Sequence, residues 1–102
     1  MDRMFHALAD ATRRDIVRHA MHDEQSVSTL ARRYPMSFAA VQKHVAVLAD
    51  AGLVTKRRSG REQLVQGNVS TIEELHRLLD EFQAMWRDRL DRFDAILNES
   101  EQ

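Results

Sequence analysis

Apolar residues recur at three- and four-residue spacings in several short segments of the chain, which is the pattern of amphipathic helices. A first helix is expected over residues 3–9, and a second from Ala11 to about residue 21, with Asp10 as its N-cap. A third, brief helix is expected to begin at a Ser28 cap and to end before Pro35, because proline disfavours helical geometry in the preceding residue. Residues 23–26 are expected to form a polar connection.

The segment that follows combines an apolar stripe with a polar, basic face. Val41, Val45 and Leu48 fall on one side of a helix, so the residues between them must point the other way. Ser37 is the expected N-cap, which leaves other first-turn N–H groups available to an anion such as a DNA phosphate. Only two residues separate this helix from the preceding one. The pair therefore predicts a helix-turn-helix over about residues 28–51.

Two short runs that favour β-structure follow Gly52, the expected C-terminal stop of the helix. They cover residues 53–58 and 62–66 and flank a turn at residues 59–61 that contains a glycine. This pattern predicts a β-hairpin over about residues 53–67, with basic residues on one strand and at the tip. Because a two-stranded hairpin is marginally stable alone, we expect it to lie against the helices as a wing.

The last third of the chain predicts one long helix over about residues 71–98, starting with a capping box from Thr71 to Glu74. Such a helix is about 40 Å long. Its apolar residues recur at alternating spacings of three and four, and they are Ile72, Leu75, Leu79, Phe82, Trp86, Leu90, Phe93 and Leu97. This stripe is more than one small protomer can cover, which predicts pairing with a second copy. The alternative is a single amphipathic helix folded back on its own core.

Composition narrows the classes of protein. The chain has 102 residues, which suits a single domain over residues 1–102, and it contains no cysteine. It has no apolar run of the ~18 residues that a membrane span needs, and its first residues do not resemble a signal peptide. We therefore expect a cytoplasmic protein that associates with the nucleoid and has no membrane partner.

The formal charge of −1 hides an asymmetry along the chain. Residues 1–68 contain eleven basic and seven acidic residues, whereas residues 69–102 contain four and nine. A basic first part with an acidic tail is expected when only the first part meets phosphate. The alternative is that both sets of charges only solvate helices.

Taken together, these elements resemble the ArsR/SmtB family of winged helix-turn-helix transcriptional repressors over nearly the whole chain. The resemblance is carried by residues 8–14 (LADATRR), 27–31 (VSTLA), 41–45 (VQKHV) and 48–54 (LADAGLV), and by Gly60 and Arg61 at the hairpin tip. It implies a mainly helical fold of order α-α-α-α-β-β-α that dimerises through the long C-terminal helix. Ala11 stands where the family commonly has proline.

The residues by which some members of this family sense metals are absent. Those members have a Cys-x-Cys motif in the helix that here contains Thr29, Leu30 and Ala31, and a second site with histidines on the last helix, where His76 stands alone. His19 and His22 have a spacing that two metal ligands accept, but no third ligand accompanies them. We therefore expect no metal and no cofactor. No arrangement of serine, histidine and acidic residues predicts an enzyme.

The sequence thus predicts a sequence-specific, double-stranded-DNA-binding transcriptional regulator, most simply a homodimeric repressor with an inverted-repeat operator. Its inducer, if it has one, is unknown. The expected DNA-binding residues are Ser37, Phe38, Ala39, Ala40, Gln42, Lys43, His44, Arg57, Arg58 and Arg61. The expected dimer interface comprises Phe5, Leu8, Leu75, Leu79, Phe82, Trp86, Leu90 and Phe93. The alternatives are a metal- or small-molecule-responsive repressor of the same fold, and a winged helix that binds proteins instead of DNA.

Overall fold

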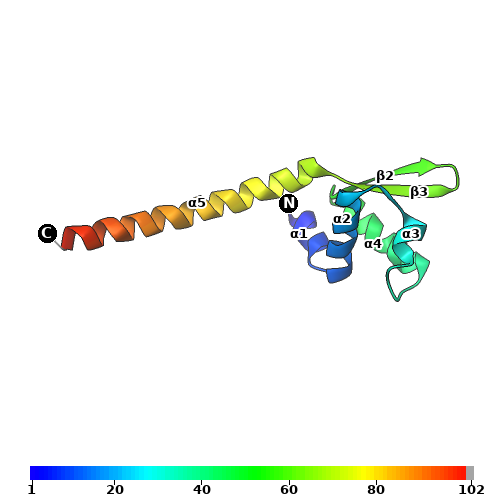
Figure 1. Cartoon of the computed structure of the whole chain (residues 1–102), viewed down its shortest axis with the longest axis horizontal. Coiled ribbons are helices and arrows are strands. Elements are labelled where there is room, and N and C mark those ends of the chain that lie inside the picture. Colours follow the sequence, from blue (N-terminus) through cyan, green and yellow to red (C-terminus); the bar gives the residue numbers. More distant parts are fainter. Residues whose placement is uncertain (101–102) are drawn as a thin grey trace. The chain divides into compact units, whose positions relative to one another are not determined.

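The computed structural model describes residues 1–100 and forms two compact units, Met1–Ile72 and the remainder from Glu73. The first unit contains α1 (Asp2–Leu8), α2 (Ala11–His22), β1 (Gln25–Ser26), α3 (Val27–Ala31), α4 (Phe38–Asp50), β2 (Val54–Ser59) and β3 (Glu62–Gly67). It also contains the first residues of α5 (Val69–Ser100), which runs as one continuous helix into the second unit (Figure 1). The expected mainly helical winged helix-turn-helix is confirmed, with one additional short strand.

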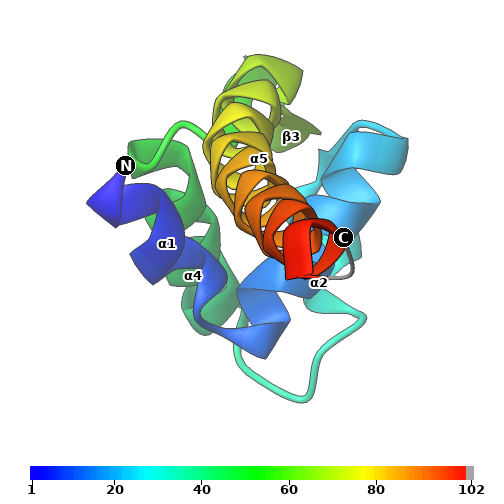
Figure 2. The ribbon, with the colours of Figure 1, turned by 90° about the vertical axis from the view of Figure 1, so that its left-hand side faces the viewer.

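The core of the first unit is made by the inward faces of the helices and by the sheet. Ile16, Val17 and Ala20 of α2 are buried, and so are the expected inward residues of α4, Val41, Val45 and Leu48. They pack with apolar residues of the remaining elements, namely Val27, Leu30, Leu53, Val54 and Val65. Helix α1 lies beside α4 (Figure 2). The helical period of the apolar residues therefore determines which face of each helix is buried.

The three strands form an antiparallel sheet in the order β1-β3-β2. In the wing, Ser59 pairs with Glu62, so the turn consists of only Gly60 and Arg61. Gly60 has φ +62°, the positive φ that a two-residue hairpin turn requires at its first position. Figure 1 shows this turn at the end of the hairpin that extends beyond the helices of the first unit. The wing is confirmed, with its strands shifted by about one residue.

The start of α3 differs from the expectation. Ser26, and not Ser28, is the N-cap, because the Oγ atom of Ser26 accepts a hydrogen bond from the N–H of Thr29 at 3.1 Å. Ser26 belongs to β1, where it pairs with Leu64, and its extended backbone suits an N-cap. The residues expected as a polar connection therefore include a short strand. Helix α3 also ends at Ala31, earlier than expected, so the turn before α4 is longer than two residues.

The start of α5 also differs from the expectation. The helix begins at Val69, so Thr71 lies inside it and does not form the expected capping box. The Oδ1 atom of Asn68 accepts a hydrogen bond from the N–H of Ser70 at 3.2 Å. The Thr71 hydroxyl instead donates to the carbonyl of Gly52 at 2.7 Å, a carbonyl that also accepts from the Asn68 side chain at 2.9 Å. These bonds fasten the first turn of α5 to the residues that follow α4.

Helix α5 presents its predicted apolar stripe to solvent. Large apolar side chains from Leu79 onward are about half exposed, among them Phe82 at 54%, Trp86 at 55% and Phe93 at 59%. The opposite face is charged, and there Nε of Arg92 lies 3.7 Å from Oδ2 of Asp88. No helix within residues 1–100 is both long enough and apolar enough to cross a membrane.

Candidate nucleic-acid interface

The outward face of α4 consists of small, apolar and polar side chains. Ser37 caps the helix, since its Oγ atom accepts a hydrogen bond from the N–H of Ala40 at 3.1 Å. Gln42 and Lys43 are exposed, and Phe38 is 47% exposed although it is aromatic. An α-helix of this kind fits the major groove of B-DNA, where glutamine, lysine and apolar groups meet base edges. The exposure of Gln42 and Lys43 agrees with the prediction that they lie opposite the apolar stripe.

Tyr34 fastens the turn between α3 and α4 to α2. Its hydroxyl donates a hydrogen bond to Oδ2 of Asp15 at 2.7 Å. This bond lowers the pKa of Asp15, with a smaller contribution from the nearby His19, while burial and the same bond raise the pKa of Tyr34. Because the turn precedes the first residue of α4, this bond helps to fix where the helix begins.

Arg13 connects three helices through its side chain. Its Nε atom donates to the carbonyl of Ala7 at 2.7 Å and Nη2 donates to that of His6 at 3.2 Å, both at the end of α1. Its Nη1 atom lies 3.3 Å from Nδ1 of His44 on α4. Asp10 accepts the backbone N–H of Arg13 at 3.0 Å, which lowers the pKa of Asp10. His44, expected among the DNA-binding residues, is thus half-buried and paired with an arginine of α2.

The wing has three arginines in different surroundings. Arg57 forms two hydrogen bonds with the carboxylate of Glu24, at 2.7 Å from Nη2 and 3.1 Å from Nε, and this contact raises the pKa of Arg57. Arg58 and Arg61 are exposed, and within residues 1–100 neither has an acidic side chain within ion-pair distance. All three are exposed, so what separates them is that Arg57 is paired with a carboxylate, whereas Arg58 and Arg61 have no acidic partner within residues 1–100.

The residues expected at the dimer interface are placed in both units. Phe5 on α1 is 47% exposed and Leu8 is partly buried. Leu75 is already buried in the single chain, whereas Leu79, Phe82, Trp86, Leu90 and Phe93 are exposed. Leu75 therefore has little surface left to contribute, and the exposed part of the stripe begins at Leu79.

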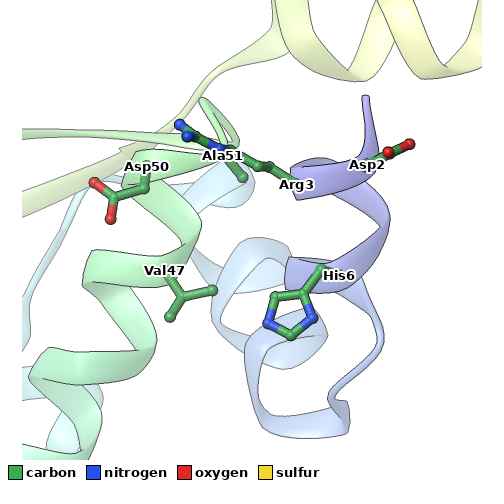
Figure 3. A pocket seen from close by; sticks show the side chains of 6 residues that line it. All are labelled: Asp2, Arg3, His6, Val47, Asp50 and Ala51. Carbon is green, nitrogen blue, oxygen red and sulfur yellow. The ribbon is translucent and has the colours of Figure 1, made fainter.

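A cleft of about 480 Å³ lies between α1 and α4 and is lined by Asp2, Arg3, His6, Val47, Asp50 and Ala51 (Figure 3). Figure 3 shows His6 and Val47 on facing walls of this cleft. Its four ionisable side chains are all exposed, so none is held in a fixed position for a ligand.

The histidines with metal-compatible spacing form contacts of another kind. His19 lies 3.3 Å from Asp15, and His22 lies 3.9 Å from Asp23. Within residues 1–100 the structure brings together no group of three histidine, cysteine or acidic side chains that could hold a metal ion.

Sequence reasoning missed two residues that contact predicted site residues, Arg13 and Glu24. Arg13 stands in one of the segments that carry the family resemblance, but its contact with His44 spans 31 positions. Glu24 lies in the segment expected to be a polar connection and pairs with Arg57 across 33 positions. For each of these two residues, the only signal in the sequence is a charged side chain to which no pairing partner was assigned.

A family model for a helix-turn-helix domain matches residues 8–57. The HTH-type transcriptional regulator Rv2034 of Mycobacterium tuberculosis is 41% identical over 81 residues, which cover 79% of this chain and 76% of that protein. An ArsR-like transcriptional regulator from Rhodococcus sp. RHA1 has a structure that superimposes with a TM-score of 0.84 at 33% identity and covers 96% of this chain and 90% of that one.

A second similar structure is that of Mb0332 from Mycobacterium bovis, solved in solution as a homodimeric winged helix-turn-helix DNA-binding domain. It superimposes with a TM-score of 0.63 at 26% identity and covers 84% of this chain and 77% of that one. These likenesses agree with the fold, and they identify the chain as a transcriptional regulator and not an enzyme. The chain belongs to the ArsR-like family of winged helix-turn-helix transcriptional regulators.

Proposed function

We propose that the chain is a homodimeric transcriptional repressor that binds an inverted-repeat operator in double-stranded DNA. The observation that carries this proposal is the division of α4 into a buried apolar face and an exposed face with Phe38, Gln42 and Lys43. Repression follows when the bound dimer occupies a promoter and excludes the polymerase.

In this proposal α4 enters the major groove and determines sequence preference. Gln42 bonds an adenine through its amide, and Lys43 reaches a guanine edge or a phosphate. Ala39 and Ala40 allow the helix to come close to thymine methyl groups, while Ser37 and Phe38 lie at the end of the helix nearest the bases. The wing supplies Arg58 and Arg61 to phosphates or the minor groove. Arg57 contributes to phosphate binding only if its ion pair with Glu24 breaks.

The second copy is expected to cover the exposed stripe of α5. Eight large apolar side chains between Leu79 and Leu97 are each about half exposed, which leaves an apolar surface on the order of 800 Å². Monomeric proteins rarely expose a continuous patch of this size, and it is close to what each partner contributes to a stable interface. The stripe repeats nearer to 3.6 than to 3.5 residues, which favours a short crossing of two nearly straight helices over a long supercoil. The homodimeric state of the Mb0332 domain supports this proposal.

Footprinting on genomic fragments tests the DNA-binding part. We expect protection of two half-sites about 10–10.5 base pairs apart, or a multiple of that distance. With such a site in hand, Gln42→Ala should relax preference at one base pair by ~1–3 kcal/mol. Arg61→Ala should instead weaken binding to all sequences alike and flatten its dependence on salt. If the two variants behave identically, the division into base contacts and phosphate contacts is wrong.

Analytical ultracentrifugation tests the dimer. Leu79→Asp places a charge on the apolar stripe and should convert the dimer to a monomer, whereas Ala84→Asp places the same charge on the opposite face of α5 and should leave it dimeric. Trp86→Ala should weaken the dimer less than Leu79→Asp does. A wild-type protein that is monomeric at micromolar concentration, yet binds its operator fully, would refute the dimer.

A further inference from the structure

The contact between Arg13 and His44 determines the chemical form of the histidine. A guanidinium group has hydrogen-bond donors only, so Nδ1 of His44 must accept the hydrogen bond at 3.3 Å. A neutral imidazole has one acceptor nitrogen and one N–H, and accepting at Nδ1 places the proton on Nε2. Within residues 1–100 no protein group accepts a hydrogen bond from that Nε2–H.

Arg13 is itself held firmly on the side away from His44. Two carbonyls at the end of α1, of His6 and Ala7, accept from its other nitrogens, and Asp10 accepts its backbone N–H. A change at Arg13 therefore alters how α1, α2 and α4 are joined and how His44 is oriented.

We propose that Arg13 is a positioning residue that fixes His44 as the Nε2–H tautomer, so that His44 donates this proton to a DNA phosphate. This inference rests on the proposed function. His44 follows Lys43 and Gln42 on α4, at the flank of the exposed face, where contacts to the DNA backbone are made. Because the imidazole is neutral, the contact orients the protein on the duplex without releasing a counterion. This distinguishes His44 from Lys43 and from the arginines of the wing.

The tautomer is measured in the free protein by the nitrogen chemical shifts and couplings of the His44 ring, in alkaline buffer. The wild-type protein should show the Nε2–H form. Arg13→Lys retains the charge but lacks the forked donor, so its His44 signals should shift toward a mixture of tautomers. A predominantly Nδ1–H ring in the wild type would overturn the proposal, as would an unchanged spectrum in a folded Arg13→Lys protein.

The phosphate contact is measured with His44→Asn, which retains an acceptor next to Arg13 and lacks the distal N–H. On the operator found by footprinting, this variant should bind about fivefold more weakly with an unchanged salt slope. Lys43→Gln, the matched control, should lower the slope itself. The contact is located with duplexes in which one phosphate is replaced by a methylphosphonate, which is neutral. The wild type should bind more weakly when the replaced phosphate is at one particular position in each half-site. Replacement at that position should not weaken the binding of His44→Asn.

The proposed function and the proposed role of His44 can be refuted separately. A wild-type protein that protects no DNA refutes the proposed function. A wild-type protein that binds its operator, with His44→Asn binding as tightly or with a flatter salt slope, refutes only the role of His44. Should Arg13→Lys fail to fold, the wild-type tautomer and the His44→Asn measurements still decide the question.

Discussion

In the proposed complex, the ion pair between Glu24 and Arg57 determines how many arginines of the wing are available to DNA phosphates. Both oxygens of the Glu24 carboxylate are bonded to Arg57, at 2.7 and 3.1 Å, in the geometry with which a guanidinium also binds a phosphate. A carboxylate in this position competes with DNA for the same donors. We therefore predict that Arg57→Gln changes the salt dependence of DNA binding little in the wild type and substantially in a Glu24→Gln background.

The magnitude follows from counterion release. Each phosphate neutralised by a basic residue adds about 0.9 to the slope of log affinity against log salt concentration. Glu24→Gln should free Arg57 and steepen the slope by about that amount. Between about 50 and 200 mM salt this corresponds to an additional affinity change of about 3.5-fold. Arg57→Gln in the Glu24→Gln background should remove this additional dependence.

The assay is fluorescence anisotropy with a labelled operator duplex across this salt range. Arg61→Gln is the matched control, because Arg61 is exposed and has no acidic partner within residues 1–100. It should lower the slope by about 0.9 in both backgrounds. Thermal unfolding of the free proteins shows whether Glu24→Gln leaves the fold intact. If Arg57→Gln lowers the wild-type slope as much as Arg61→Gln does, Glu24 does not hold Arg57 away from DNA and the reasoning is refuted.

Two further predictions concern stability. A Cβ atom at Gly67 would lie 2.0 Å from the sulfur and 3.0 Å from the Cα atom of Met21. Gly67→Ala should therefore destabilise the fold by ~1–3 kcal/mol, measured by urea unfolding. An unchanged urea midpoint would show that α2 and β3 can separate freely. The pKa of Asp15 is lowered in the folded state, chiefly by the hydrogen bond from Tyr34. The contribution of Asp15 to stability is therefore present above the unfolded pKa of about 3.9, and it is lost as the pH falls through the lower folded pKa. Tyr34→Phe removes that bond and should make the loss of unfolding free energy between about pH 5 and pH 2 shallower, whereas parallel pH profiles for the two proteins would contradict this cause.

Helical periodicity predicted which residues of α4 are buried, because burial on a helix depends on spacing along the chain. Val41, Val45 and Leu48 could be assigned to the core from their positions alone, and all are buried. The strand β1 could not be found in this way. It has only two residues, too few to show a period. It exists because Gln25 and Ser26 pair with Val65 and Leu64, which lie 40 and 38 positions later in the chain. Because of this pairing, the N-cap of α3 is Ser26 and not the expected Ser28.

In the candidate site, too, local spacing predicts some features, whereas others depend on distant parts of the chain. The exposure of Gln42 and Lys43 follows from the apolar stripe on the other side of their helix, and the sequence predicted it. The partners of His44 and Arg57 depend on contacts that span 31 and 33 positions, which no local pattern contains. An isolated charge in a sequence does not indicate whether it will bind DNA or another part of the chain.

The distribution of these partners explains how a chain of net charge −1 can present a basic surface. The fold uses the arginines of α2 internally: Arg13 and Arg14 donate to carbonyls at the end of α1, and Arg18 lies near Asp15. Within residues 1–100, the basic side chains without such partners in the helix-turn-helix and the wing are Arg32, Arg33, Lys43, Lys56, Arg58 and Arg61. These lie in the turn before α4, on α4 itself and on the wing, while most of the excess acidic residues lie on α5. A potential that attracts DNA depends on where unpaired charges lie and not on their total, so we expect the attraction to come mainly from the unpaired basic residues of α4, the turn before it and the wing.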